Sequence, residues 1–393
     1  MRYVIVIASL TLAVSSILLD RRRPGPDSWL CREGFCRADQ AAADTGPPAP
    51  QAPEEFTSLA NEDASDPYVW AAYADSLTAH GDLDKASAAI DHATRLGPGL
   101  PPLLIRAAYF DFTHDQFDRG AALSNRILGE TATFDPLVFS YLEYFRKGSS
   151  PILGTAIPAA SRPAQSWAAW IGTNGSPSDV LQTWRWMKQN RLADAPSALD
   201  LTWKLWHRQF FRSAQELWSD WNGPAGGDHP ARGLGLARQL VFNGRFRDVP
   251  NGSPFDWAIP AQASVHIFRG QGLDLHFMGV ENVKLDGIRQ STVVSPGRYR
   301  FSALIQSEGL TTDQGPFFRI FDPQNSSRLN VQTAQIKGTT ARSEISCEFI
   351  VPAGTEALTI QLERRESERF DNKIQGTLHV YEVSLIPHDQ PPK

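Results

Sequence analysis

The stretch "LVFNGRFRDVPNGSPFDWAIP", residues 240–260, lies where the character of the sequence changes. Upstream of it, apolar residues and tryptophans recur at spacings of three and four, which predicts helices. Downstream, short segments alternate apolar and polar residues between Gly- and Pro-containing turns, which predicts strands. The stretch either opens a ligand-binding β domain or joins two packing units. In both cases the sequence predicts a multidomain protein, with an α-helical part followed by an all-β part.

The composition excludes some classes of function. A chain of 393 residues has room for two or three domains. A hydrophobic content of 41% is enough for a sizeable core, so general disorder is not expected. The formal net charge is −5 and no basic arm is present, which argues against contacts with nucleic-acid phosphates. We therefore expect no nucleic-acid partner.

The amino-terminal segment has the pattern of a membrane anchor. Residues 3–19, "YVIVIASLTLAVSSILL", carry no charge. As a helix they would rise about 25 Å, slightly less than the ~30 Å hydrocarbon core of a bilayer. We predict a transmembrane anchor over residues 1–23, with a cleaved signal peptide as the alternative. Arg21, Arg22 and Arg23 follow the apolar run, and this positive charge favours a cytoplasmic location for the rest of the chain.

Residues 24–56 are predicted to be a linker, because "ADTGPPAPQAPEE" at 43–55 is rich in proline and has no apolar period. Within this range, ahead of the proline-rich stretch, Cys31 and Cys36 form a C-x4-C pair. No second Cys or His pair lies nearby, so a zinc site would lack half its ligands. A small disulfide loop and two free thiols both remain open. Cys347 lies in an alternating segment and is expected to be a small buried residue.

Residues 66–98, "DPYVWAAYADSLTAHGDLDKASAAIDHATRLGP", predict two amphipathic helices joined by a turn. They resemble a tetratricopeptide repeat, whose period is 34 residues. Further repeats would begin at Pro101 and Asp135, within a helical domain that we place at 57–235. The resemblance implies that this domain binds a protein partner. The signature positions of the first repeat are Trp70, Tyr73, Ala74, Leu77, Gly81, Ala86, Ile90, Ala93 and Pro98.

Eight of the eleven tryptophans lie between residues 161 and 222. They could form an aromatic platform for sugar rings or for a partner helix. Alternatively they fill the irregular end of the helical stack, and the helical spacing of Trp203, Trp206, Phe210 and Leu217 favours this interpretation.

The segment "SPGRYRFSALI" shows the strand pattern of the second half: Tyr299, Phe301, Ala303 and Ile305 share one face. Repeated segments of this kind predict an antiparallel β-sandwich or jelly roll over residues 240–390. The opening "LVFNGRF", the central "PGRYRFSALIQ" and the closing "LHVYEVSLIP" resemble the carbohydrate-binding modules of the galactose-binding-like jelly-roll class.

The resemblance implies a polysaccharide ligand. This chain departs from the class at Arg247, where an acidic residue is common, and at Glu382, where an aspartate is common. These changes argue against a structural calcium site, and we expect no cofactor.

The combination of anchor, helical repeats and jelly roll resembles bacterial proteins associated with exopolysaccharide biosynthesis and export. The resemblance and the Cys31–Cys36 pair favour a single-pass inner-membrane protein with the bulk of the chain in the periplasm. The three arginines after the apolar run leave the cytoplasmic side of the membrane as the alternative.

A sugar site needs exposed aromatic rings and planar polar groups. Trp257 with the adjacent Asp256 is the best candidate, although the ring could instead pack over the end of the sandwich. Arg319 is a second candidate, and its alternative is a solvated strand face. His266 and His276 lie on neighbouring expected strands, but a metal site there lacks a third ligand.

The sequence contains none of the common catalytic or nucleotide-binding signatures, such as G-x-S-x-G, H-E-x-x-H, the P-loop or the Rossmann glycines. It therefore predicts a non-enzymatic, membrane-anchored scaffold whose repeats bind a protein and whose jelly roll contacts a glycan. One alternative is a glycan-active enzyme that uses Glu363, Glu366 or Glu368 as catalytic carboxylates. The other is a purely structural assembly subunit.

Overall fold

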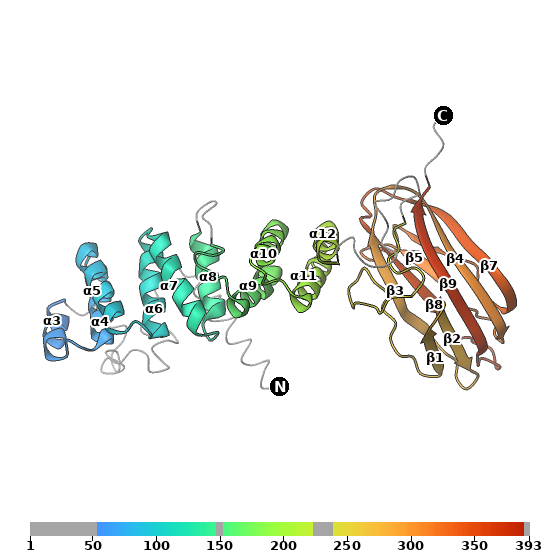
Figure 1. Ribbon diagram of the computed structural model, residues 1–393, viewed down its shortest axis with the longest axis horizontal. Helices are drawn as coiled ribbons and strands as arrows, with labels where there is room; N and C mark the ends of the chain where they lie inside the picture. Colours follow the sequence, from blue (N-terminus) through green and yellow to red (C-terminus); the bar gives the residue numbers. More distant parts are fainter. Residues whose placement is uncertain (1–52, 147–151, 223–238, 389–393) are drawn as a thin grey trace, which may run out of the picture. The chain divides into compact units, whose positions relative to one another are not determined.

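The computed structural model describes residues 53–146, 152–222 and 239–388 (Figure 1). The chain divides into two compact units. One contains the residues up to Trp170 with Trp186–Leu192, and the other contains Ile171–Arg185 with the residues from Ala193 onward. The predicted anchor, the Cys31–Cys36 pair and most of the linker lie outside the described residues. No helix in the described ranges is both long and apolar enough to cross a membrane.

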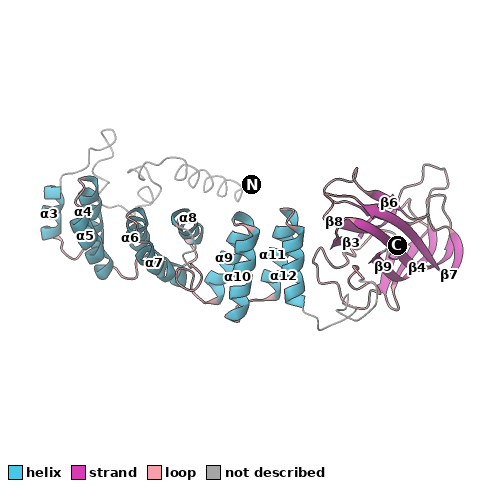
Figure 2. Cartoon of the chain, turned by 90° about the horizontal axis from the view of Figure 1, so that it is seen from above, coloured by secondary structure: helices cyan, strands magenta, loops and turns pink. Residues whose placement is uncertain are grey.

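The described part of the amino-terminal half is helical, as predicted, and Figure 2 shows helices and strands in separate parts of the chain. Consecutive helices form hairpins, among them α4 with α5, α6 with α7, and α11 with α12. The helices are α3 (Pro53–Glu62), α4 (Pro67–Ala79), α5 (Leu83–Leu96), α6 (Pro101–Thr113), α7 (Phe117–Glu130), α8 (Asp135–Phe145), α9 (Ser161–Asn174), α10 (Pro177–Gln189), α11 (Ala195–His207) and α12 (Phe211–Asn222).

In the first hairpin, α4–α5, individual residues explain the helix cap, the turn and the close packing of the two helices. The Asp66 side chain caps α4 by accepting a hydrogen bond from the Tyr68 amide at 2.8 Å. Gly81 provides the turn with φ of 86°, a conformation that favours glycine. Ala74 and Ala86 are fully buried, so their small side chains let the two helices approach closely.

The remaining signature residues of this repeat surround the same core. Trp70 and Tyr73 are half-buried against it, and the Trp70 indole donates a hydrogen bond to the Ala64 carbonyl at 3.0 Å. Pro98 follows immediately after the end of α5. Helices α6 and α8 begin at Pro101 and Asp135, where the 34-residue period places the second and third repeats, and α7 is the second helix of the second repeat.

The tryptophans between 161 and 222 are used mainly in packing. Trp167 and Trp184 are almost completely buried. The Trp184 indole donates a hydrogen bond to Asp220 at 2.7 Å, which links α10 to α12. Trp221 is the most exposed of the group at 38%. These side chains therefore act mainly as core residues, which agrees with their helical spacing.

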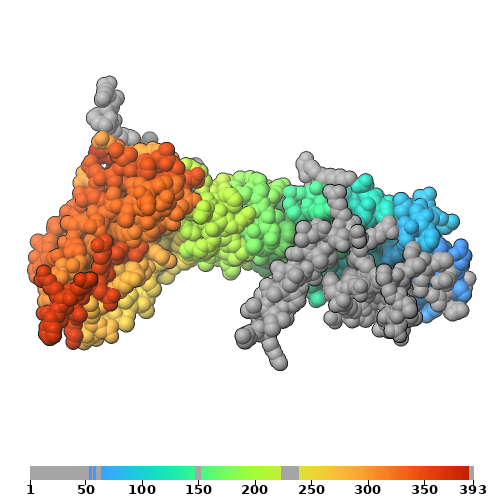
Figure 3. Space-filling view, turned by 180° about the vertical axis from the view of Figure 1, so that it is seen from behind, coloured from blue at the N-terminus to red at the C-terminus, as the bar shows by residue number. Residues whose placement is uncertain are grey.

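The carboxyl-terminal half contains two antiparallel sheets, as predicted, and they face each other across one hydrophobic core (Figures 1 and 2). Figure 3 shows the surface of this sandwich from behind, coloured yellow to red. The five-stranded sheet has the order β1-β2-β9-β4-β7, and the four-stranded sheet has the order β3-β8-β5-β6. The strands are β1 (Val265–Arg269), β2 (Leu273–Met278), β3 (Leu285–Val293), β4 (Gly297–Leu310), β5 (Phe317–Phe321), β6 (Asn330–Gln332), β7 (Gly338–Val351), β8 (Ala357–Arg364) and β9 (Gln375–Pro387).

Strand β4 lies between β9 and β7 in its sheet and shows the predicted alternation. Tyr299, Phe301, Ala303 and Ile305 are buried in the core. Phe301 lies opposite Leu385 of β9 and Cys347 of β7. Cys347 is half-buried, and its burial raises the pKa of the thiol to about 11.

The opening stretch of the sandwich, residues 239–260, forms no regular strand, and we refer to it as the strap. On one side it bonds to β9, because the Leu240 amide donates to the Leu385 carbonyl at 2.9 Å and the Val383 amide donates to the Gly244 carbonyl at 2.8 Å. On the other side it bonds to β3, where the Gln290 side chain accepts from the Phe242 amide at 3.0 Å and donates to the Phe242 carbonyl at 2.7 Å. The strap therefore connects the two sheets.

The last helical hairpin packs on the strap. Trp218 of α12 makes an edge contact with Phe242, with ring centroids 5.0 Å apart, and lies 5.3 Å from Phe255. Trp206 of α11 lies 5.5 Å from the same Phe255 ring. Helices α11 and α12 belong to the same compact unit as the sandwich, and these aromatic contacts join them.

Gly244 provides a test of the strap. A Cβ atom at this position would clash with the Val383 carbonyl oxygen, which is a backbone atom that cannot move aside alone. We expect Gly244→Ala to lower the stability of the sandwich by about 1–3 kcal/mol, the usual cost of overpacking. Calorimetry should show a lower unfolding temperature for the transition that contains the sandwich. Gly270→Ala is the matched control, because a Cβ there meets no atom within 4 Å, and an equal effect of both substitutions would contradict this account.

Candidate functional site

The structure places Asp256 and Trp257 inside the strap. Trp257 is 1% exposed, and its ring lies 4.8 Å from that of Phe246. Its indole donates a hydrogen bond to the Asn243 carbonyl at 3.2 Å. The exposed aromatic face predicted at Trp257 is therefore not present, because the ring fills the interior beneath the strap.

Asp256 is also buried, at 2% exposure. Its carboxylate accepts hydrogen bonds from the amides of Asn251 at 2.9 Å and Trp257 at 2.7 Å, which fixes the turn of the strap. Burial raises the pKa of this carboxyl group, although the two amide bonds oppose the shift. The position of Asp256 gives it a structural role and no contact surface for a ligand.

Arg319 lies on the outward side of β5, between the buried Phe318 and Ile320, as the alternation predicts. Its guanidinium donates to Asn330 at 2.9 Å, lies 4.5 Å from the centre of the Phe321 ring and lies 3.7 Å from Glu363. The side chain is partly exposed but held by three neighbours.

The proposed catalytic carboxylates do not form an isolated acid pair. Glu363 is on β8 and has Arg319 and Arg365 as ionic neighbours, the latter at 3.6 Å. Glu366 and Glu368 follow it on the exposed loop after β8.

His266 and His276 lie directly opposite each other on β1 and β2, on the outward face of the five-stranded sheet. The His276 ring makes a hydrogen bond with Thr377 at 3.1 Å. Within the described ranges, no cluster of three or more His, Cys, Asp or Glu side chains could hold a metal ion.

The outward face of the five-stranded sheet, which we call the open face, carries residues that the sequence analysis did not select. The strand register aligns Phe268 of β1 with Asp274 of β2, Asp274 with His379 of β9, and His379 with Gln306 of β4. The row crosses four adjacent strands. Phe268 is 57% exposed, and the other three side chains are half-buried.

The polar groups of the open face hold one another in position. Nδ1 of His379 lies 2.7 Å from Oδ1 of Asp274, which fits donation from the imidazole to the carboxylate. The Tyr381 hydroxyl donates to Gln306 at 3.0 Å, and the Arg342 guanidinium lies 4.1 Å from the centre of the Tyr381 ring. Tyr381 is at an irregularity in the β4–β9 pairing, because Leu304 pairs with Glu382 and Ile305 pairs with Val380.

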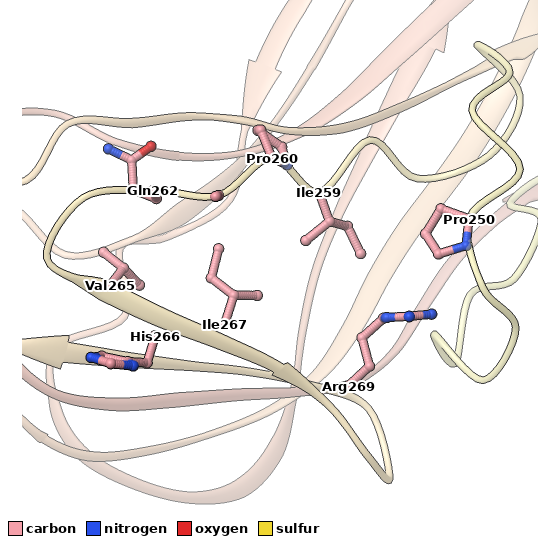
Figure 4. Close-up of a pocket in the computed structure, with 9 residues that line it drawn as sticks. Pro250, Ile259, Pro260, Gln262, Val265, His266, Ile267 and Arg269 are labelled. Carbon is pink, nitrogen blue, oxygen red and sulfur yellow. The ribbon is translucent and has the colours of Figure 1, made fainter.

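A cavity of about 490 Å³ lies beside the edge strand β1 (Figure 4). In Figure 4, the side chains of Ile259 and Ile267 point toward each other across it. Arg269 donates a hydrogen bond to the Asp248 carbonyl at 3.0 Å. His266 belongs both to this lining and to the open face, so the cavity borders the face. The lining residues are Pro250, Ile259, Pro260, Ala261, Gln262, Val265, His266, Ile267 and Arg269.

Comparison with solved structures gives distant similarities for each half of the chain. A carbohydrate-binding module, TmCBM61 in complex with β-1,4-galactotriose, is 11% identical and covers 39% of this chain and 100% of its own, with a TM-score of 0.27. A structure described as CBM4 is 13% identical and covers 38% of this chain and 99% of its own, with a TM-score of 0.28. YrrB, a tetratricopeptide-repeat protein with an unusual peptide-binding site, is 16% identical. It covers 42% of this chain and 90% of its own, with a TM-score of 0.23.

No protein-family model and no curated protein sequence matches the chain. The structural similarities are low in both identity and TM-score, and they assign no function to the chain.

Trp257 provides a test that separates packing from ligand binding. Trp257→Phe would remove one of two donors to the Asn243 carbonyl, which keeps the Phe246 amide at 2.9 Å, and would leave a space beneath the strap. We expect the lost hydrogen bond and the smaller ring together to destabilise the sandwich by about 1–3 kcal/mol. Glycan binding by the folded protein should not change. Chemical denaturation and a binding assay on the same samples measure both quantities, with Trp221→Phe as an exposed control. Loss of binding without loss of stability would restore Trp257 as a ligand residue.

Proposed function

We propose that the chain is a non-enzymatic adaptor whose open face binds a glycan and whose helical hairpins bind a protein partner. The observation that carries the glycan part is the row formed by Phe268, Asp274, His379 and Gln306, with Tyr381 beside it. It combines aromatic rings with planar hydrogen-bonding groups on a rigid sheet. Sites for small polar ligands use such a combination, because rings cover apolar C–H faces and amides or carboxylates bond hydroxyl groups.

The dimensions of the row fit an oligosaccharide. It crosses four strands, and three strand spacings amount to about 14 Å. That length accommodates a short run of sugar rings lying across the strands. Since the backbone pairing fixes the positions of the side chains, little conformational entropy would be lost on binding.

The charges of the open face favour a neutral glycan over a polyanion. Arg300 is paired with Glu344 at 2.7 Å, and Arg245 from the strap is paired with Glu382 at 3.1 Å. These arginines are therefore already compensated. Asp274 in the row and Arg342 over the Tyr381 ring carry opposite charges, so the face offers a polyanion little net positive charge.

The protein-binding part of the proposal is supported by aromatic residues on α6 and α8. Tyr144 is 60% exposed. The Tyr109 ring is half-buried and lies 5.5 Å from Tyr141 and 6.2 Å from Phe145. Tyrosine and phenylalanine are enriched in protein interfaces, where a rigid ring contributes a large contact area. A partner that covers this surface would bury Tyr144.

Anchoring in a bacterial inner membrane, a periplasmic location and a role in exopolysaccharide assembly complete the proposal. They are supported by the apolar segment at 3–19 and by the Cys31–Cys36 pair. A reporter enzyme fused after Lys393 that is active only in the periplasm tests the location. We expect cells that carry this fusion to show reporter activity. If only a second fusion, to a reporter that is active in the cytoplasm, shows activity, the periplasmic placement is wrong.

Binding of the full chain to immobilised neutral polysaccharides tests the glycan site. We expect Tyr381→Ala to weaken binding about tenfold, because it removes the ring that supports Arg342 and the hydroxyl bonded to Gln306. Tyr381→Phe keeps the ring and should have a smaller effect. Ile350→Ala is the control that should bind like the wild type, because this 61% exposed residue of β7 is on the same sheet face but away from the row, opposite Arg298 of β4. If the wild type retains no polysaccharide, or if Tyr381→Ala binds equally well, the open face is not the glycan site.

A further inference from the structure

The loop between β8 and β9 exposes a phenylalanine at its tip. Phe370 is 106% exposed, more than any of the other large apolar side chains that the described residues leave in solvent. Exposing a whole phenylalanine ring costs hydrophobic free energy, about 2 kcal/mol relative to burial. An exposed ring at this cost indicates that Phe370 contacts another molecule, and the loops around it indicate which kind.

The base of the loop is held rigidly by Arg364. Its side chain is fully buried, and its guanidinium donates to Asn282 at 3.3 Å, Thr312 at 3.3 Å and the Asn372 carbonyl at 3.4 Å, and also to the Val283 carbonyl. These partners belong to three different loops at the same end of the sandwich. Burying a guanidinium is costly unless it is well bonded, so the network acts as a brace that fixes the loops relative to one another.

A second loop, residues 279–284, runs beside the first. Asn282 donates to the Ser367 carbonyl at 2.9 Å and accepts from the Ser367 amide at 2.9 Å. The Gly279 amide donates to the Ile374 carbonyl at 3.0 Å. This loop carries Val280, which is 52% exposed, and follows Met278, which is 46% exposed. The two bonded loops thus present three apolar side chains at the end of the sandwich where β9 begins.

Carboxylates surround these apolar side chains. Glu281, Glu366, Glu368 and Asp371 are exposed, and none of them forms an ion pair with another residue in the described ranges. Three neighbouring cations are engaged, because Lys284 is paired with Asp286 at 2.8 Å, Arg369 with Asp313 at 3.3 Å and Arg365 with Glu363 at 3.6 Å. Lys373 is exposed and has no ion pair in the described ranges, so it offsets one of the four carboxylates. The two loops therefore combine exposed apolar side chains with an excess of unpaired negative charge.

We propose that this acidic apolar tip, formed by the loops 279–284 and 365–374, docks on a second protein. Phe370 inserts into an apolar pocket of the partner, and lysine or arginine side chains at the rim of that pocket pair with Glu366, Glu368 and their neighbours. The charge complementarity selects a basic protein surface and disfavours an anionic lipid surface, which would repel the carboxylates. The brace at Arg364 fixes the base of the loop before binding, which lowers the ordering entropy lost when the partner docks.

The test uses selection of random peptides displayed on phage against the immobilised full chain. We expect the selected peptides to combine lysine or arginine with aromatic or aliphatic residues. Their affinity should fall about tenfold or more for Phe370→Ala, as for an anchor residue at the centre of an interface. It should also fall for the double variant Glu366→Lys, Glu368→Lys. Ile350→Ala, which truncates an exposed apolar side chain on another strand, should bind like the wild type.

Two results would overturn the proposal. One is a selection in which no peptide depends on Phe370, or in which the dependent peptides are acidic. The other is sedimentation of the wild type, but not of Phe370→Ala, with vesicles of phosphatidylglycerol and phosphatidylcholine, which would assign the ring to a lipid surface.

Discussion

The two hydrogen bonds between the Gln290 side chain and the Phe242 backbone are the buried polar contact through which the strap closes over the core of the sandwich. Gln290 is 1% exposed, so an unpaired amide there would incur a full desolvation penalty. The bonds attach the strap to the four-stranded sheet, while the Gly244–Val383 bond attaches it to the five-stranded sheet. The apolar faces of both sheets are then enclosed in one core, and the outward face of the five-stranded sheet is left to carry polar side chains.

The strap also answers the question raised by the stretch at 240–260. Its aromatic residues point in two directions, since Phe246 and Trp257 pack together beneath it and Phe242 and Phe255 contact the tryptophans of α11 and α12. It therefore connects the last helical hairpin, α11–α12, to the sandwich. The sequence features that suggested a ligand site, an aromatic and an acid in a turn-rich segment, are equally the features of a buried joint: Asp256 fixes the turn and Trp257 fills the space under it.

Much of the fold could be predicted from local pattern, whereas the open face could not. The alternation in β4 correctly placed Phe301 and Ile305 inward, and the spacing of Ala74, Gly81 and Ala86 correctly indicated a helical hairpin. The row on the open face instead depends on which strands are neighbours. Asp274 and His379 are 105 positions apart in the sequence, and only the pairing of β2 with β9 brings them together. Such long-range pairing leaves no local signal, although the polar residues of "LDLHFM" and "LHVYE" did mark one face of each strand as outward.

The open face and the acidic tip share a physical design, which is why both suit a scaffold. In each, side chains that a ligand would touch are held by the backbone or by buried bonds before any ligand arrives: the strand register fixes the row, and Arg364 fixes the loops. Binding would then need no closing lid, and the cost in conformational entropy would be small at either place. A catalyst gains from a site that closes and excludes water. A rigid exposed face lacks that property, but it would hold a glycan or a protein in a constant position, as the proposed adaptor requires.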